Sequence, residues 1–557
     1  MIFVLGISSF LYFRYVVPYH ICFKEQIQLF VYSSSSFLSY FSKPAFLVCL
    51  GGDFLTQFFY FKGGGAAVAS LLLIAEWRLI FLILKRFSVK KPHDMSLLLW
   101  SLIPVMIEWI YFASVAFFVS FSVSFIIAMA VFLFYAQTSG KISVAAGILL
   151  ILPLYLMAGA SVFLFVAITV LYEIYHGKKR FIYCTAIIGL SLIIPLLLRL
   201  HFLLTLKQAC FYPFPDVRQG LTLLTLIFIL MVMMIAYEYH FRVKFGYIFS
   251  TIILTSIWIT GLVKTTDLKQ ENLFGITIEA CQNHWDKVLE IAEKNELKNP
   301  VATQYVNIAL SQKGIIGERF LEFYQPFSSG LFLPVKPSSN WFVIFSANDA
   351  YFHIGDMDMA QHAAMVGMIS TPLQRSARLT ERLAEINLST GDIPVATKYI
   401  RVLESTLFHK IKTDNKNTNV PHRGIFQQNV IRKSDDIRSS LELLVEGDPD
   451  NLPAVNYLLC YYLLNKNITA FFKAYTSFCK EKIINVPKVY AQALLIYFAG
   501  TNSAINEVIS YGIHPDIITS FSEYTRLYEK SEGNLLPMQE KFPDTYWLFY
   551  HFAVMKD

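Results

Sequence analysis

Hydrophobic residues in the first half of the chain gather in runs that are long enough to cross a lipid bilayer. A transmembrane helix needs about 20 predominantly apolar residues. Runs of this kind lie at 2–22, 64–84, 181–199, 219–237 and 246–263. The first of them lacks the basic start and the small-residue cleavage site of a secretory signal, so we expect it to be retained as a helix.

Two further apolar runs are too long to be single spans. As one helix, residues 95–137 would extend for about 65 Å, which is twice the thickness of the hydrocarbon core. We expect this run to fold back near the Ser-rich "VSFSVSF" at 119–125, and the run 142–175 to break near "MAGAS" at 157–161. The pattern predicts about nine spans, with the count open between seven and nine.

Beyond about residue 267 the apolar positions recur with helical spacing, which indicates a soluble helical domain. The segment "HWDKVLEIAEKN" (284–295) followed by "YVNIALSQKG" (305–314) is typical of a helical hairpin. We therefore expect an all-α protein, with a polytopic transmembrane helix bundle over 1–265 and an α-helical domain over 266–557.

Two segments of the second half, "YFHIGDMDMAQHAA" and "INLSTGDIPVATKY", repeat each other. Gly355 and Gly391 are 36 residues apart, as are Ala360 and Ala396, and Ala470 in "LLNKNITAFFKAY" stands at the equivalent place two periods later. A period in the mid-thirties with a turn Gly and a packing Ala resembles tetratricopeptide repeats. Each hairpin of such an array buries one apolar face only by stacking on the next. The resemblance implies a concave surface for a protein partner, and stiffening of the domain is the alternative.

Two polar runs interrupt this helical pattern. The run "HKIKTDNKNTNVPHRG" (409–424) is interpreted as a flexible excursion. In "RSARLTERLAE" (375–385) the charged residues have helical spacing, which favours a solvated, salt-bridged helix face over a binding site. Its charged residues at this spacing are Arg378, Glu381, Arg382 and Glu385.

The seven cysteines have no CxxC and no paired Cys/His spacing, so the sequence predicts neither zinc nor a redox motif. Cys460 and Cys479 flank one predicted hairpin; two buried free thiols are favoured, and a bridge is left open. The chain also lacks HExxH, a P-loop, a nucleophile elbow and a dinucleotide fingerprint. We therefore expect no metal and no cofactor.

Composition separates the two halves of the chain. Charged residues are 16% of the sequence, against about 25% in soluble domains. Residues 1–265 hold 19 basic and 8 acidic residues, a net charge of +11, and the remainder holds 28 and 32, a net charge of −4. The excess positive charge belongs to the membrane half, where it suits contact with anionic lipid. We expect no nucleic-acid partner.

The basic clusters also predict the orientation. They are "KRFSVKK" (85–91), Lys141, "GKKR" (177–180) and "HFRVK" (240–244). All fall on one side under the predicted span count, and by the positive-inside rule that side is cytoplasmic. Residues 23–63, residues 200–218 and everything after about 264 then lie on the other side. The sequence predicts a multi-pass protein of the cytoplasmic (inner) membrane with an extracytoplasmic C-terminal domain.

Polar residues near the outward side supply the candidate chemistry. We expect the acids to converge around one outward-facing cavity and the basic residues to bind an anion there; ordinary loops are the alternative. The candidate catalytic residues are Glu25, Asp53 and Glu108. The candidate substrate-binding residues are Gln26 in "KEQIQLF", Gln57 in "GGDFLTQFFYFKGGG", Arg199, His201, and Asp216 and Arg218 in "FYPFPDVR".

Three acids fall within or beside predicted spans. Glu108 lies about midway along a span, where a charge is costly to bury, and both a functional role and a neutral, hydrogen-bonded structural role are open. Glu76 is expected to pair with Arg78 or to reach the interface. Glu173 stands beside the "GKKR" cluster and is expected at the interface.

Several segments together resemble an uncharacterised bacterial membrane-protein family known only as a domain of unknown function. They are "KEQIQLF", "GGDFLTQFFYF", "RLAEINLSTGDIPVATKYIRVLESTLF" and "NLPAVNYLLCYYLLNKNITAFFKAY". The resemblance covers most of the chain and implies no activity.

A second similarity is to the GT-C class of glycosyltransferases, multi-span enzymes that take sugars from polyprenyl-phosphate carriers. In that class an extracytoplasmic acid after the first helix acts as base, and some members carry tetratricopeptide repeats on the same side. Glu25 occupies the matching place, with Asp53 in the same loop. The class often has two closely spaced acids, whereas here Lys24 and Gln26 flank a single Glu.

The sequence leaves three functions open. In a transferase, Glu25 would deprotonate the acceptor, Arg199 or Arg218 would hold the lipid phosphate, and the repeats would present the acceptor. A cell-envelope scaffold would need only the repeats and a protein partner. A transporter would use Glu108 and the two broken runs as its path. Membrane lipid is an expected partner throughout, and a polyprenyl-phosphate-linked substrate is expected in the first case.

Overall fold

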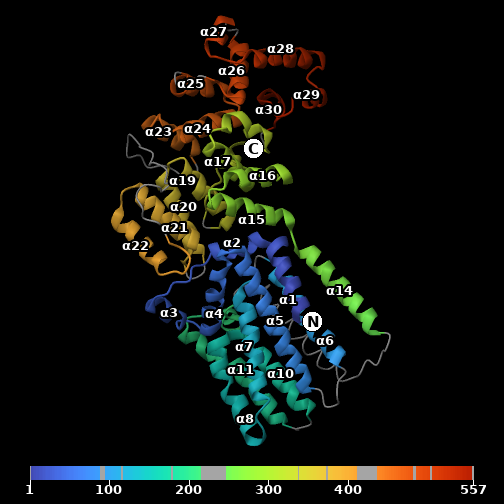
Figure 1. Cartoon of the computed structure of the whole chain (residues 1–557). Helices are drawn as coiled ribbons and strands as arrows, with labels where there is room; N and C mark the ends of the chain where they lie inside the picture. Colours follow the sequence, from blue (N-terminus) through green and yellow to red (C-terminus); the bar gives the residue numbers. More distant parts are fainter. Residues whose placement is uncertain are drawn as a thin grey trace. The chain divides into compact units, whose positions relative to one another are not determined.

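The computed structural model describes residues 2–87, 94–114, 117–176, 180–214, 246–336, 338–371, 374–410, 436–480, 485–501 and 505–554. Within these ranges the regular elements are all helices, so the predicted all-α class is confirmed. The chain forms two compact units (Figure 1). The first is Met1–Leu268 with Glu404–Lys410, and the second is Lys269–Leu403 with Ile411–Asp557.

The first unit is built from strongly apolar helices. Its elements are α1 (Ile2–Leu11), η1 (Tyr12–Val16), α2 (Pro18–Gln26), α3 (Ser34–Tyr40), α4 (Phe46–Thr56), η2 (Gln57–Tyr60), α5 (Lys62–Phe87), α6 (Asp94–Phe112), α7 (Val119–Tyr135), α8 (Gly140–Leu149), α9 (Ile151–Ala158), η3 (Gly159–Ser161), α10 (Val162–Tyr175), α11 (Phe181–His201), α12 (Leu206–Phe211) and α14 (Gly246–Thr265).

Among the described residues, three helical stretches are long and apolar enough to cross a membrane: Lys62–Phe87, Gly140–Tyr175 and Phe181–His201. A fourth is reached if the bent pair Ile2–Val16 and Pro18–Gln26 counts as one span. These stretches mark the chain as a membrane protein. The predicted span 219–237 lies outside the described residues.

The predicted first span, 2–22, is not one straight helix. The chain bends by 76° between η1 and α2. Pro18 at the start of α2 has no backbone N–H to continue the preceding helix, which explains why the break falls there. The bend gives α2 its own direction, and α2 carries Lys24 and Glu25.

The two long apolar runs are both interrupted. The run 95–137 forms two helices, α6 and α7, which are separated by residues 113–118, a few residues before the predicted "VSFSVSF". In the run 142–175 the 3₁₀ turn η3 falls inside the predicted "MAGAS" segment. Gly159 adopts a positive φ of 61°, and its neighbour Ala160 donates a backbone hydrogen bond to Tyr212 O at 2.8 Å.

Helix α5 lies at the centre of the first unit and packs against α1, α6 and α7. Small side chains at Ala66 and Ala69 are fully buried on one side of α5, and farther along it Leu73, Ile80 and Leu84 continue the core. Helix α4 packs against α7, and α10 packs against both α7 and α11. Side chains on α5, α6 and α7 are therefore held in one continuous apolar core.

The second unit consists of short helices connected by tight turns. Its elements are α15 (Leu268–Cys281), α16 (Trp285–Asn295), α17 (Pro300–Gln312), α18 (Ile316–Arg319), η4 (Phe320–Glu322), η5 (Phe327–Gly330), α19 (Trp341–His353), α20 (Met357–Ser370), α21 (Ala377–Ser389), α22 (Ile393–Glu404), α23 (Ile437–Gly447), α24 (Leu452–Leu464), α25 (Ile468–Phe478), α26 (Lys488–Thr501), α27 (Ile505–Ser510), α28 (Pro515–Lys530), α29 (Leu535–Lys541) and α30 (Tyr546–Phe552). The predicted hairpin over 284–314 is present as α16 and α17, which pack against each other.

The repeated segments have the same turn geometry. Three residues separate α19 from α20, α21 from α22, and α24 from α25. The middle residue of each turn is left-handed: Gly355 has φ 88°, Gly391 has φ 76° and Lys466 has φ 54°. The third residue caps the next helix through its side chain, as Asp356 does for Met359 N at 3.2 Å. In the Gly-Asp pattern, the glycine thus supplies the left-handed turn residue and the aspartate supplies the N-cap of the next helix.

The third copy of this pattern is shifted by one residue from the predicted alignment. Its cap is Asn467, which accepts from Ala470 N at 3.1 Å. Counting four residues from the cap leads to Phe471, which is fully buried like Ala360 and Ala396, whereas Ala470 is only half-buried. The capping geometry, and not the identity of the small residue, sets the register.

Candidate functional site

Glu25 is bound by a residue that is far away in the sequence. It lies near the end of α2 and is 6% exposed. Its Oε1 atom is 2.5 Å from Nε2 of His409, which is also buried. His409 belongs to the Glu404–Lys410 segment, which groups with the first unit. The structure therefore brings a carboxylate and an imidazole together within one unit.

The Glu404–Lys410 segment is held in the first unit by backbone and aromatic contacts. Tyr32 N donates to Ser405 O at 2.7 Å. The ring of Phe408 stacks on Tyr60 with centroids 5.5 Å apart, and the His409 ring meets Tyr60 edge-on at 5.1 Å. These contacts orient the imidazole toward Glu25 and surround the pair with apolar rings.

Lys24, the neighbour of Glu25, is also buried and not in a solvated loop. Its Nζ donates to Phe112 O at 3.3 Å, and its ammonium lies 5.1 Å from the Phe112 ring centroid. The Nε2 atom of His20, one turn earlier on α2, is 3.4 Å from the same carbonyl. The polar side chains of His20 and Lys24 on α2 thus lie against the carboxyl end of α6.

Asp53 lies elsewhere in the first unit, on α4. Its Oδ2 accepts from Tyr40 OH at 2.7 Å. Gln57, one turn later, accepts from Tyr32 OH at 3.1 Å and donates to Phe54 O at 2.8 Å. Both residues therefore fasten the segment that carries Tyr32 and Tyr40 onto α4.

Glu108 makes a third, separate set of contacts. It is fully buried on α6, where Ser122 on α7 donates a hydrogen bond to its Oε1. Its electrostatic partner is the equally buried Glu76 on α5, so the predicted pairing of Glu76 with Arg78 is wrong. Glu173, predicted at the interface, is also buried: it accepts from Tyr135 OH at 2.8 Å and forms an ion pair with Arg180 at 3.3 Å.

The remaining predicted residues lie as follows. Gln26 is the last residue of α2 and is half-buried. Arg199 is half-buried near the end of α11, where the exposed His201 meets Phe202 edge-on at 4.9 Å. Asp216 and Arg218 lie outside the described residues. Glu25, Asp53 and Glu108 contact three different partners. These partners are His409, Tyr40 and Ser122, respectively.

The charged run 375–385 in the second unit is not the solvated face that its spacing favoured. Arg378 and Arg382 on α21 are 3% and 8% exposed. Both bind the buried Asp349 on α19, Arg378 through Oδ2 and Arg382 at 3.0 Å through Oδ1. Arg378 also donates to Tyr305 OH at 2.9 Å. The helical spacing of the arginines was compatible with a solvated face and with a buried network. The buried network forms because both arginines bind Asp349, which lies outside the run 375–385.

This network changes the titration of its members. Burial by itself would raise the pKa of Asp349, but Arg378 and Arg382 hold that pKa below its ordinary value. Burial lowers the pKa of His353 to about 3, and Arg382 adds to the effect. The network is thus ionised around Asp349 while His353 is neutral near pH 7.

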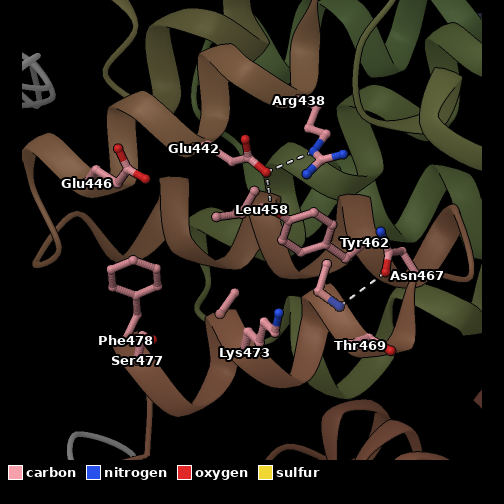
Figure 2. A pocket seen from close by; sticks show the side chains of 12 residues that line it. Arg438, Glu442, Glu446, Leu458, Tyr462, Asn467, Thr469, Lys473, Ser477 and Phe478 are labelled. Carbon is pink, nitrogen blue, oxygen red and sulfur yellow. Dashed lines mark hydrogen bonds and ion pairs between the residues drawn. The ribbon is translucent and has the colours of Figure 1, made fainter. Parts of the chain in front are cut away.

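The second unit also has a hollow of about 460 Å³ between α23, α24 and α25. Figure 2 shows Arg438, Glu442 and Glu446 on one wall and Lys473 and Phe478 on the other. Arg438 and Glu442 form an ion pair at 2.8 Å on the wall formed by α23. The hollow therefore presents charges of both signs beside aromatic and aliphatic carbon.

The cysteines agree with the interpretation that the sequence favoured, which was a pair of buried free thiols. Cys460 and Cys479 are both buried free thiols and are not bridged. Among the described residues, no group of three or more His, Cys, Asp or Glu side chains is arranged to hold a metal ion.

Helices that can cross a membrane, joined to a second all-helical unit, define an all-α membrane protein. The chain belongs to a family of unknown function, DUF6057, whose model matches residues 1–553. No curated protein and no solved structure matches the chain. This family membership confirms the resemblance to a domain of unknown function that we inferred from the quoted sequence segments.

His409 is the residue that sequence analysis missed. It opens the polar run 409–424, which was interpreted as a flexible excursion, and residues 411–424 of that run lie outside the described residues. The available signal was the apolar "STLF" directly before it, since Leu407 and Phe408 suit a segment that packs against other side chains. Pattern alone does not say that its partner is 384 residues away.

Proposed function

We propose that the protein is a membrane-embedded transferase that moves a sugar from a polyprenyl-phosphate carrier to an acceptor hydroxyl at the extracytoplasmic face. The observation that carries the proposal is the buried Glu25–His409 pair. A carboxylate hydrogen-bonded to an imidazole is an arrangement that serves general-base catalysis, because the acid orients the ring and stabilises its protonated form. The place of Glu25 after the first apolar run supports the similarity to GT-C enzymes.

In the proposed step the acceptor O–H bond breaks and its proton passes to the Glu25–His409 pair. The acceptor oxygen forms a bond to the anomeric carbon of the sugar. The bond between that carbon and the phosphate oxygen breaks, and its electron pair leaves with the polyprenyl phosphate. The positive charge of Arg199 near the end of α11 suits the leaving phosphate.

The proposal includes the finer membrane architecture that the basic clusters predict. We place the protein in the cytoplasmic membrane with about nine spans and with its second unit outside the cytoplasm. Tyr32 and Tyr60 are exposed in the same region as Gln57, and such amphipathic rings suit the boundary between lipid and water.

Mass spectrometry of the lipids retained by the protein purified in mild detergent is the first test. We expect enrichment of a polyprenyl-phosphate species over bulk membrane lipid. Glu25→Gln and His409→Asn should each abolish sugar transfer from that lipid while membrane abundance is unchanged, and Glu446→Gln in the second unit serves as the control. Transfer at the wild-type rate in both variants would refute the role of the pair.

Binding of a protein partner is a second candidate function, and the hollow between α23 and α25 favours it. The recurring turn geometry supports a tetratricopeptide-like array, in which such hollows receive peptide segments. If this function is the main one, deletion of residues 267–557 should be as damaging as deletion of the gene, and Glu25→Gln should be silent. A stoichiometric protein partner that is lost in Lys473→Glu would locate the partner at the hollow.

A further inference from the structure

Two carboxyl groups meet inside the apolar core of the first unit. Glu76 lies on α5 and Glu108 on α6, and both side chains are fully buried. Glu76 belongs to the candidate span Lys62–Phe87. Ser122 donates to Glu108 Oε1, while Glu108 Oε2 and both carboxyl oxygens of Glu76 have no hydrogen-bond partner among the described residues. A buried polar group without a partner is rare and calls for an explanation.

In the described part of the chain, no cation compensates this pair in the way that the arginines compensate Asp349. The interactions that act on the two carboxyls come from each other and from Ser122. Two adjacent negative charges in a hydrocarbon-like environment are costly, so the pair holds at least one proton near neutral pH and releases it only when the pH is raised. A carboxylic acid that donates to a neighbouring carboxylate also satisfies oxygen atoms that otherwise have no partner.

Among the described residues, the polar groups of α2 approach α6 about one turn from Glu108. Phe112 is four residues after Glu108, about 6 Å farther along the helix, and its carbonyl is the one that His20 and Lys24 contact. Toward the other end of the helices the buried side chains include the apolar Ile80, Leu84, Val105, Phe125, Met129 and Phe132, and the hydroxyl of Ser101, two turns before Glu108, donates to Leu98 O at 2.9 Å. Along α6, the polar groups of α2 therefore approach Glu108 more closely than Ser101 does.

Other titratable groups lie on the elements that pack against α5 and α6. They are Tyr12, Arg14 and Tyr15 on η1, Tyr19, His20, Cys22, Lys24 and Glu25 on α2, Tyr60 on η2, Tyr135 on α7 and Lys264 on α14, together with Lys62, Arg78, Lys85 and Arg86 on α5 and Tyr111 on α6. Tyr12 meets Trp109, the residue after Glu108, edge-on with ring centroids 5.7 Å apart, and His20 and Lys24 contact the Phe112 carbonyl one turn farther along α6.

We propose that Glu76 and Glu108 form a proton-binding site in the membrane core, in which one exchangeable proton is shared between the two carboxyls and enters from the end of α6 that the polar side chains of α2 contact. The inference does not rest on the proposed sugar transfer. It assigns to Glu76 a role that its position in the sequence did not suggest. A site with access from one end binds and releases protons and does not conduct them across the bundle.

Infrared spectroscopy of the full-length protein in lipid bilayers tests the proposal, because a protonated carboxyl has a C=O stretch that a carboxylate lacks. We expect this band in the wild type, a downshift on exchange into D2O, and a loss of amplitude as the pH is raised. Glu76→Gln and Glu108→Gln each leave a single buried carboxyl, so in each variant the band should persist but lose its pH dependence. Glu173→Gln is the matched control, since Glu173 is buried in the same unit but paired with Arg180, and it should leave the band unchanged.

Three results would overturn the proposal. Absence of a protonated carboxyl band at every pH would show that the pair holds no proton. A band insensitive to both pH and D2O would show a permanently protonated structural pair. A band whose pH dependence survives in both Gln variants and is lost in Glu173→Gln would belong to another group. The wild-type measurements decide the first two cases even if a Gln variant does not fold.

Discussion

Each of the two units contains a group of buried acids, and these two groups are compensated in different ways. In the second unit, Asp349 is bound by Arg378 and Arg382, so the buried negative charge is surrounded by cations. In the first unit, Glu76 has another carboxyl, Glu108, as its electrostatic partner. With Glu385, which binds Arg382 at 2.9 Å, the first arrangement is neutral, whereas the second loses one of its two negative charges when it binds a proton.

This difference separates buried charges that stabilise the fold from buried carboxyl groups that exchange protons with the surroundings. Breaking a buried ion pair is strongly destabilising because the remaining charge is left without compensation. A carboxyl pair that takes up a proton needs no such partner, and titration then changes its state without unfolding the protein. We therefore expect substitutions in the Asp349 network to reduce stability, and substitutions at Glu76 and Glu108 to change proton binding first.

The largest expected effect is on the Asp349 network. Arg378→Met should reduce the unfolding free energy of the second unit by about 3–5 kcal/mol, because half of the compensation of Asp349 is removed. Hydrogen exchange of α19 and α21 in the full-length protein in detergent measures the loss. Arg319→Met is the control: Arg319 pairs with Glu293 and Glu322 at the surface, where ion pairs contribute about 1 kcal/mol or less. Equal losses of unfolding free energy in Arg378→Met and Arg319→Met would show that the buried network contributes no more to stability than a surface ion pair.

The next effect concerns the hydrogen bond between Glu25 and His409 in the first unit. His409→Ala should release the Glu404–Lys410 segment, since a hydrogen bond to a charged group contributes about 1.5–3 kcal/mol. That loss corresponds to roughly ten-fold to a hundred-fold faster amide exchange in this segment. His514→Ala, at an exposed histidine of the second unit, should leave it unchanged. Unchanged protection in His409→Ala would mean that aromatic packing of Phe408 alone holds the segment.

A third effect depends on pH and belongs to the second unit. Burial lowers the pKa of His353 to about 3, so in the folded state it stays neutral as the pH falls. In the unfolded chain it binds a proton below about pH 6.5. The unfolded state then holds more protons, and stability falls by up to about 1.4 kcal/mol per pH unit between about pH 6.5 and 3.

His353→Gln should flatten this dependence. Thermal unfolding followed at a series of pH values compares the two proteins, and above about pH 7.5 their stabilities should run in parallel. The lowered pKa of Asp349 acts in the same direction at lower pH, so a residual slope below about pH 4 is expected in the variant. An identical slope in both proteins between pH 5 and 6.5 would show that His353 is protonated in the folded state.

The sequence allowed the helices to be predicted far better than their long-range partners. The candidate spans 64–84 and 181–199, the breaks in both long runs and the hairpins all follow from local spacing, because apolar periodicity and the Gly-Asp turns act within a few residues. Such signals need no information about the rest of the chain.

The partners of the charged residues could not be derived in this way. Arg378 was expected at a solvated face because helical spacing is the same for exposed and buried ion pairs, and Asp349 is 29 residues away. His409 lies at the start of a polar run, and its contact with Glu25 is fixed by tertiary packing. Glu76 and Arg78 are too close in a helix to face each other, which a stricter use of helical geometry would have excluded.

The smallest expected effect tests the turns that give the second unit its regularity. Gly391 has φ 76°, and nothing lies within 4 Å of an added Cβ, so Gly391→Ala meets backbone strain without a steric clash. The loss should be about 1 kcal/mol in unfolding free energy, read from hydrogen exchange of α21 and α22. Gly500 near the end of α26 has similarly open surroundings and helical backbone, so Gly500→Ala should be neutral or stabilising. If Gly391→Ala is as well tolerated, the left-handed turn is adaptable, and the regularity of the hairpins rests on helix packing and not on the Gly-Asp turns.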